Sequence, residues 1–140
     1  MHDSSCVSVI IPVWNLWDMT EACLRSLATH SAGENMQVVV VDNHSTDATT
    51  TELAPLGEAL FGTSFKAVRM PENVGFARGC NAGAGAADGD LLFFVNNDTT
   101  LTPRWLPPLR EAMNGARLGA VGPLLLYPDG TVQHCGIYVN

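Results

Sequence analysis

Leu91-Leu92-Phe93-Phe94-Val95-Asn96-Asn97-Asp98 joins five apolar residues to three polar ones, and the last of these carries a charge. The apolar run predicts a strand buried on both faces, as in the middle of a parallel sheet. Ligands of open α/β sheets bind just beyond the carboxyl ends of the strands. The Asn-Asn-Asp sequence is therefore a candidate site, and its oxygen ligands suit a divalent cation such as Mg²⁺ or Mn²⁺. The alternative is a strand that ends in an Asn/Asp turn before a capped helix.

The composition is that of one soluble globular domain of 140 residues, acidic overall with a net charge of -7. Its seven basic residues form no basic patch, which argues against nucleic acid as a partner. The longest apolar runs are no longer than a strand, and the N-terminus lacks the features of a signal peptide. A cytoplasmic location follows. The four cysteines lack zinc-type spacing, so reduced core thiols are expected.

Strands and helices alternate through the first two-thirds of the chain, which predicts a mostly parallel, doubly wound sheet with flanking helices. The predicted strands span residues 7–13, 38–41, 65–70 and 91–95. Helices are expected over residues 18–30, 47–60 and 76–87, the first two capped by Asp18 and Asp47 and the second shortened or broken by Pro55 and Gly57. The third is rich in alanine and glycine, so it can lie very close to the sheet or to a ligand.

The last third of the chain follows a different pattern. A helix with Pro103 in its first turn is expected to precede a strand over residues 118–126. The turn sequence Tyr127-Pro128-Asp129-Gly130-Thr131 then predicts a hairpin with residues 132–139. The chain stops within that strand, which predicts an incomplete domain with an exposed sheet edge and hence a homo-oligomer.

Three polar clusters follow predicted parallel strands: Trp14-Asn15, residues 42–45 and residues 96–98. The fold rule places all three at one edge of the sheet, so together they predict a pocket for a nucleotide or a metal. A dinucleotide-binding enzyme would need G-x-G-x-x-G between the first strand and the first helix. The loop from Val13 to Asp18 contains no glycine, so that class of enzyme is excluded.

Four segments of the chain carry a combined pattern: residues 7–15, 40–47, 73–83 and 96–98. They read as an opening strand, V-D-[ND]-x-S-x-D, N-x-G-x-A-x-x-x-N-x-G, and Asn-Asn-Asp in the place of a metal-binding D-x-D. In this order and at this spacing they resemble family 2 glycosyltransferases, inverting GT-A enzymes that transfer sugars from nucleotide diphosphates. Residues 122–123 and 127–136 further resemble the branch with rhamnosyltransferase-like enzymes.

The resemblance implies one GT-A nucleotide-sugar-binding domain over residues 1–140, apparently truncated at its C-terminus. It implies transfer of a sugar from a UDP- or dTDP-linked donor to a glycan or glycolipid acceptor, in cell-wall or polysaccharide synthesis. The implied location is the cytoplasm or, by peripheral association, the inner face of the membrane. The family's catalytic base lies further along the chain, so no catalytic residue is assigned. The alternative is a non-catalytic nucleotide- or metal-binding module that needs a missing segment or a partner.

The contacts implied by the resemblance transfer position by position. Nucleotide-sugar contacts are implied for Pro12, Val13, Trp14, Asn15, Asp42, Asn43, Ser45, Asn73, Gly75, Asn81, Asn96 and Asn97, and metal binding for Asp98. Asp42 would accept hydrogen bonds from the base or ribose, with an Asx turn that closes the strand as the alternative. Asn81 is equally explained as a buried polar group bonded to a neighbouring loop. Because Asn96 replaces an acid, the metal would depend on diphosphate oxygens and waters, so metal and nucleotide are expected to bind together.

Overall fold

The computed structural model describes residues 5–115 and 118–136. Two compact units make up the chain, a first that ends at Leu101 and a second that begins at Thr102. The first unit contains, in order, β1 (Val7–Val13), α1 (Trp17–His30), β2 (Met36–Asp42), α2 (Thr49–Phe61), the short 3-10 helix η1 (Gly62–Ser64), β3 (Phe65–Arg69), α3 (Phe76–Ala86) and β4 (Leu91–Phe94). The second contains α4 (Leu106–Gly115), β5 (Leu125–Leu126) and β6 (Val132–His134).

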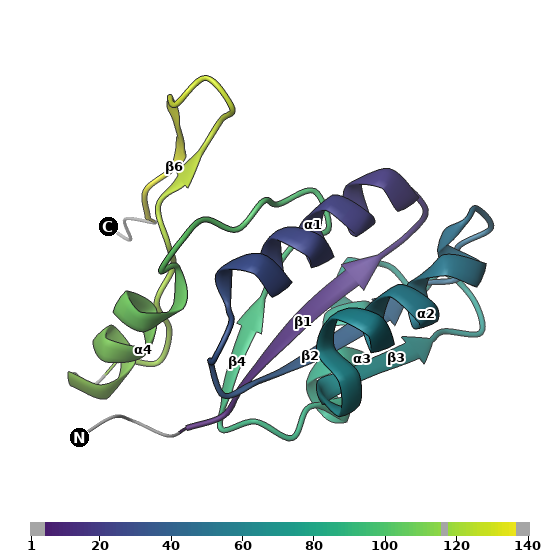
Figure 1. Ribbon diagram of the computed structural model, residues 1–140, viewed down its shortest axis with the longest axis horizontal. Coiled ribbons are helices and arrows are strands. Elements are labelled where there is room, and N and C mark those ends of the chain that lie inside the picture. The colour runs from purple at the N-terminus through teal and green to yellow at the C-terminus, as the bar shows by residue number, and fades with distance from the viewer. Residues whose placement is uncertain (1–4, 116–117, 137–140) are drawn as a thin grey trace. The chain divides into compact units, whose positions relative to one another are not determined.

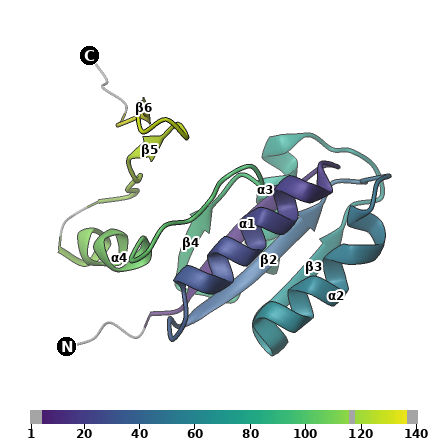
Figure 2. The same ribbon diagram turned by 45° about the horizontal axis from the view of Figure 1, so that its top comes forward.

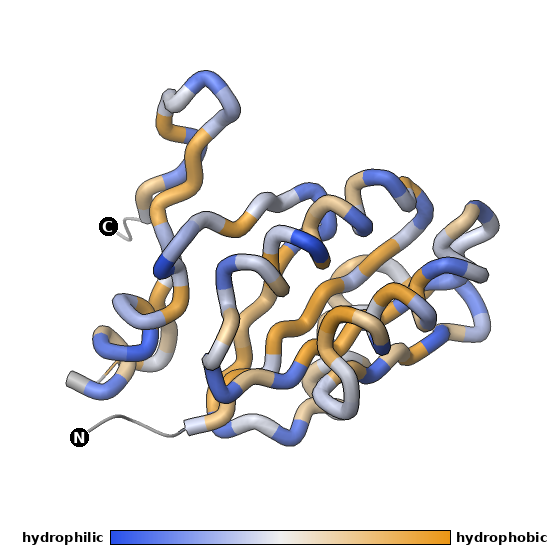
Figure 3. Tube along the Cα trace, viewed as in Figure 1, coloured by the Kyte–Doolittle hydropathy of each residue, from blue (hydrophilic) through white to orange (hydrophobic). Residues whose placement is uncertain are grey.

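The first unit is built on a four-stranded parallel sheet with the order β3-β2-β1-β4 (Figure 1). The two inner strands, β1 and β2, each carry a strongly apolar stretch (Figure 3). Their β-branched residues, the valines and isoleucines, are almost fully buried, as a strand covered on both faces requires. The predicted mostly parallel sheet is confirmed. Because the strands are parallel, the loops that follow β1 and β2 lie at the same edge of the sheet.

Helices cover both faces of this sheet, with α1 and α2 on one side and α3 on the other (Figures 1 and 2). The small residues of α3 let it lie directly on the strands, as the sequence predicts. A Cβ added at Gly83 would lie 2.4 Å from Ile10 Cγ2 and 3.0 Å from Val41 Cγ2. Because side chains alternate along a strand, Val9 and Ile11 point to the opposite face, toward α1 and α2.

The expected burial of β4 on both faces is wrong. Among the described residues β4 pairs with β1 only, so it forms an edge of the sheet. Leu92 and Phe94 pair in register with Ser8 and Ile10, on the face that α3 covers over β1 and β2. Their side chains are 45% and 48% exposed. Five apolar residues in a row therefore mark a strand whose second face is uncovered within this unit, and the predicted self-association stays a prediction.

Two predicted helix features also differ from the structure. The N-cap of α1 is Leu16, in a left-handed conformation, and not Asp18. The α2 helix runs unbroken across Pro55. Because proline has no N–H, the carbonyl of Thr51 loses its helical donor, but Thr51 and Pro55 are both exposed, so water can reach this carbonyl. Gly57 is buried, and a Cβ added there would lie 2.2 Å from the Phe65 ring. Glycine at this position thus permits close packing of α2 on β3 and does not interrupt the helix.

The second unit keeps the predicted hairpin but shortens its strands. Only Leu125–Leu126 of the predicted residues 118–126 form a strand, paired antiparallel with β6. Tyr127 and Thr131 close the predicted turn through a 2.8 Å hydrogen bond from Tyr127 N to Thr131 O. The α4 helix begins at Leu106, after Pro103, and residues 137–139 of the predicted strand lie outside the described residues. Over the described ranges, no helix is both long and apolar enough to cross a membrane.

Candidate functional site

The carboxyl edge of the parallel sheet carries a cavity of about 450 Å³ within the first unit. Its wall combines residues from the ends of β1, β2 and β4 with the start of α3. The lining residues are Pro12, Val13, Trp14, Asn43, Asn73, Gly75, Phe76, Asn96, Asn97 and Asp98. Among these described residues Asp98 alone is charged. The cavity wall therefore offers one negative charge and no cationic side chain.

The loop between β1 and α1 brings Trp14 into the wall through a strained backbone. Asn15 and Leu16 have left-handed φ values of 56° and 58°, which residues other than glycine rarely adopt. Three hydrogen bonds between this loop and the loop after β2 hold this conformation. Asn15 N donates to Ser45 Oγ at 2.8 Å, Trp17 N donates to Asp47 Oδ2 at 3.0 Å, and Thr46 N donates to Asn15 Oδ1 at 2.8 Å. Trp14, just before the strained pair, remains 57% exposed in the wall.

Two asparagines brace the loop that leads into α3. Asn43 is buried, and its Nδ2 donates to Asn73 Oδ1 at 2.9 Å while its Oδ1 accepts from Val74 N at 2.9 Å. Asn73 Oδ1 also accepts from Gly75 N at 3.0 Å. Gly75 is the N-cap of α3 and has a φ of 81°, a conformation that favours glycine. This brings the positive end of the α3 dipole to the cavity.

The segment after β4 supplies the acidic group. Thr99 N donates to Asn96 O at 3.1 Å, which closes a turn around Asn97 and Asp98. Asp98 is exposed at this turn and lines the cavity. Within the described residues, no three His, Cys, Asp or Glu side chains gather into a complete metal site. A cation would therefore share its shell between Asp98, an amide oxygen such as that of Asn96, and oxygens of a ligand or water, a set that Mg²⁺ accepts.

Cys23 of α1 contacts the same turn. Its thiol is buried and donates to Asn96 O at 3.8 Å. Burial, and next the negative charge of Asp98, raise the pKa of the Cys23 thiol to about 12. The thiol is therefore protonated at neutral pH, as a hydrogen-bond donor must be.

The sequence pattern of glycosyl transferase family 2 matches residues 8–134 of the chain. The chain belongs to this family. The O-antigen biosynthesis protein RfbC of Myxococcus xanthus is 32% identical over 135 residues, which cover 96% of the chain and 10% of RfbC. The mannosyltransferase PcManGT of Pyrobaculum calidifontis, solved with GDP-Man and Mn²⁺, matches with a TM-score of 0.64 and 26% identity over 70% of the chain and 29% of its own length. Residues 1–349 of S. aureus TarS, solved with UDP-GlcNAc, match with a TM-score of 0.64 and 26% identity over 77% of the chain and 30% of that fragment.

These relatives confirm the GT-A fold and the family predicted from the sequence. The chain spans only 10% of RfbC and 29% and 30% of the two solved glycosyltransferases. Both of those structures contain a nucleotide sugar, and that of PcManGT also contains Mn²⁺.

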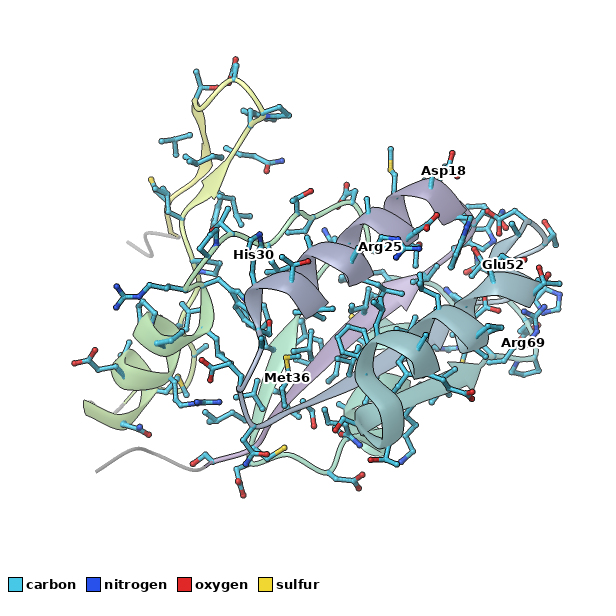
Figure 4. All side chains as sticks on the ribbon, viewed as in Figure 1. Asp18, Arg25, His30, Met36, Glu52 and Arg69 are labelled. Carbon is cyan, nitrogen blue, oxygen red and sulfur yellow. The ribbon has the colours of Figure 1, made fainter. Side chains whose placement is uncertain are left out.

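The structure of this family 2 chain brings most of the predicted contact residues to the cavity, but four lie outside its wall. Asn15 and Ser45 support the β1–α1 loop through the hydrogen bonds above. Asp42 is 4% exposed, its Oδ1 accepts from Ser45 N at 2.8 Å, and its other oxygen pairs with Arg69 at the end of β3 (Figure 4). Asp42 thus forms the turn that the sequence offered as the alternative. Its contact with a base or ribose stays a prediction.

Asn81 is the fourth predicted residue outside the wall. It is exposed on α3, so the alternative of a buried polar group is wrong. The cavity meets α3 at the start of the helix, where Gly75 and Phe76 line it. Asn81 lies more than one helical turn further along α3, outside the cavity wall. A contact between Asn81 and a ligand stays a prediction.

Phe76 is a wall residue that sequence reasoning missed. It is the first residue of α3, lines the cavity and is 62% exposed. The available signal is a large aromatic side chain directly after Gly75, at the start of a helix otherwise made of small residues. An exposed aromatic ring in a cavity wall suits contact with the face of a base or a sugar.

Asp47 gives a pH-dependent prediction for the β1–α1 loop. Burial acts to raise the pKa of Asp47, but hydrogen bonds from Thr49 and Trp17 outweigh it and hold the pKa below its ordinary value. Asp47→Asn leaves one acceptor oxygen for the two amides and is expected to lower the free energy of unfolding by about 1 kcal/mol at pH 7. A lowered carboxyl pKa stabilises the fold above the ordinary value of about 3.9 and stops doing so as the pH falls through the lower folded value.

The difference between wild type and Asp47→Asn should therefore be full at pH 6 and shrink below about pH 4. Urea unfolding at a series of pH values measures it. Thr50→Ala, which removes a hydroxyl bonded to the Asp47 carbonyl and not to its carboxylate, is the control for a general effect on the start of α2. A difference that persists unchanged at pH 2 would contradict the role of the carboxylate.

Proposed function

We propose that this chain is the donor-binding part of a glycosyltransferase and holds the diphosphate of a nucleotide sugar through a divalent cation on Asp98. One observation carries the proposal. The cavity at the carboxyl edge of a GT-A sheet has an exposed carboxylate as its one charged lining residue in the described chain. A diphosphate would be repelled by this carboxylate unless a cation lies between the two.

The chain's own residues would bind and orient the donor. Trp14 and Phe76 offer exposed aromatic faces to the base or sugar. The first turn of α3 offers backbone amides to phosphate oxygens, as helix N-termini do. Asn96 and Asn97 can donate and accept hydrogen bonds at the same place. Bound at Asp98, Mg²⁺ or Mn²⁺ would supply a Lewis acid that stabilises the charge on the departing diphosphate.

The proposed reaction is a single displacement at the anomeric carbon, with inversion. An acceptor hydroxyl attacks, its proton passes to a carboxylate base outside the residues assigned here, and the nucleoside diphosphate leaves. The acceptor class we propose is a glycan or glycolipid, and the 32% identity to an O-antigen biosynthesis protein supports it. Such an acceptor fits a place at the cytoplasmic face of a membrane.

Calorimetric titration with UDP, GDP and dTDP, each with Mn²⁺ and each with EDTA, tests the proposal. We expect one of the three to bind at least roughly tenfold more tightly with Mn²⁺, because the cation offsets the repulsion from Asp98. The matching nucleoside is the control, since without phosphates it should show no metal effect. Binding of none of them, or equal binding with and without metal, would sink the proposal. Release of nucleoside diphosphate from a nucleotide sugar then separates an active transferase from a non-catalytic binding module.

A further inference from the structure

Three side chains of α1, each one helical turn after the last, place polar atoms on the helix face that packs into the protein: Thr20, Cys23 and Ser26. Thr20 and Cys23 are fully buried, as are their neighbours Leu24 and Leu27. Asp18 and Arg25, in contrast, are exposed on the same helix (Figure 4). A polar group inside an apolar face is destabilising unless it is hydrogen-bonded. This row of three side chains therefore needs hydrogen-bond partners, and the position of those partners indicates its role.

All three side chains bond to one segment, residues 96–101, which lies more than seventy residues further along the chain. Asn97 Nδ2 donates to Thr20 Oγ1 at 3.1 Å, Cys23 Sγ donates to Asn96 O at 3.8 Å, and Leu101 N donates to Ser26 Oγ at 3.0 Å. Two of these contacts come just before Asp98 in the chain, and one comes just after it. The row thus holds the 96–101 segment on both sides of the carboxylate.

The direction of each hydrogen bond is fixed by its partners. The Thr20 hydroxyl donates back to Leu16 O at 3.4 Å, and the Ser26 hydroxyl donates back to Cys23 O at 2.8 Å. Each hydroxyl therefore turns its oxygen lone pairs toward an N–H group of the 96–101 segment, and an N–H group can only donate. Valine or alanine would fill the same places on α1 but could not accept these bonds.

We propose that Thr20, Cys23 and Ser26 are positioning residues that aim the Asp98 carboxylate into the cavity. Asp98 is itself exposed, so the direction of its side chain depends on the backbone at either side. The same helix begins at the strained loop that carries Trp14, so α1 links the two walls of the cavity in one rigid element. The inference rests on the proposed function, because it concerns how the metal site is held.

Thr20→Val tests the row, because it keeps the shape of the side chain and removes the acceptor. We expect the Mn²⁺-dependent gain in nucleoside diphosphate affinity to fall roughly tenfold, the usual effect of losing an outer-shell partner of a metal ligand. Affinity measured in EDTA should stay at the wild-type value. Thr20→Ser keeps the hydroxyl and should keep the wild-type metal effect. Thr29→Val is the matched control, because the Thr29 hydroxyl is exposed on α1 and bonds only its own helix.

Ser26→Ala is the second variant, at a half-buried position, and it tests the contact after Asp98 if Thr20→Val does not fold. Melting temperatures of all variants are measured alongside the titrations. Loss of the metal effect in Thr20→Val or Ser26→Ala, with unchanged affinity in EDTA, supports the inference. A metal effect equal to that of wild type in both folded variants overturns it. Wild-type protein that shows no metal effect overturns the proposed function instead, and with it the need for positioning.

Discussion

Asp98→Asn is expected to remove the whole Mn²⁺-dependent part of nucleoside diphosphate binding. Asp98 is the one charged residue in the described cavity wall, and an amide is a much weaker ligand for a hard cation than a carboxylate. The loss should equal the whole Mn²⁺-dependent gain of wild type and should therefore be at least as large as the roughly tenfold loss expected from removal of an outer-shell partner of a metal ligand. With Mn²⁺ present, the variant should bind nucleotide no more tightly than the same variant does in EDTA.

The same substitution should have the opposite sign when metal is absent. In EDTA the wild-type carboxylate repels the diphosphate, and at about 4 Å this repulsion is worth on the order of 1–4 kcal/mol between unit charges near a protein surface. Asp98→Asn removes it, so the variant should bind nucleotide in EDTA as well as wild type or more tightly. A reversal of sign between the two conditions cannot arise from misfolding.

Titration of both proteins with the nucleotide that binds wild type, in Mn²⁺ and in EDTA, measures this reversal. Asp18→Asn is the matched control, since it removes an exposed carboxylate from the first turn of α1, outside the cavity wall. It should reproduce wild-type affinities in both conditions. Equal losses in Mn²⁺ and EDTA for Asp98→Asn would show a steric or folding effect and would contradict a metal at this residue.

The sheet was predictable from sequence because its inner strands carry their own signal. Runs of β-branched residues like those in β1 and β2 are typical of a strand covered on both faces, and in the structure these residues are buried. The run in β4 carries the same signal but lies at an edge, because what covers a strand is decided by elements elsewhere in the chain. Local rules also missed the start of α1, where Asp47 from another loop binds the first amide.

The site was predictable where it depends on topology and unpredictable where it depends on side-chain direction. The carboxyl ends of parallel strands meet at one edge, so Trp14, Asn43 and Asp98 come together as expected. Nothing in the sequence reveals that Asp42 turns inward to Arg69, because that requires the neighbouring strand β3. Thr20 was missed for a related reason. Its spacing marks a buried position, but only the structure shows which segment it bonds.

Gly83→Ala is expected to lower the free energy of unfolding by about 1–3 kcal/mol, although alanine is the better helix former. The added Cβ would lie 2.4 Å from Ile10 Cγ2 and 3.0 Å from Val41 Cγ2. Both methyl groups belong to buried β-branched residues of the inner strands, whose rotamers are fixed, so neither can move aside. The α3 helix must therefore rise from the sheet, which also shifts its first turn at the cavity.

Gly85→Ala on the same helix is the matched control, because a Cβ there meets nothing within 4 Å. It gains helix propensity without a clash, so it should stabilise the protein by roughly 0.5–1 kcal/mol. Urea unfolding of the two variants therefore gives changes of opposite sign for the same substitution two residues apart. If Gly83→Ala proved as stable as Gly85→Ala, close contact between α3 and the sheet could not be what requires glycine. Gly83→Ala should also weaken nucleotide binding while Gly85→Ala leaves it unchanged, because only Gly83→Ala lifts the helix whose first turn lies at the cavity.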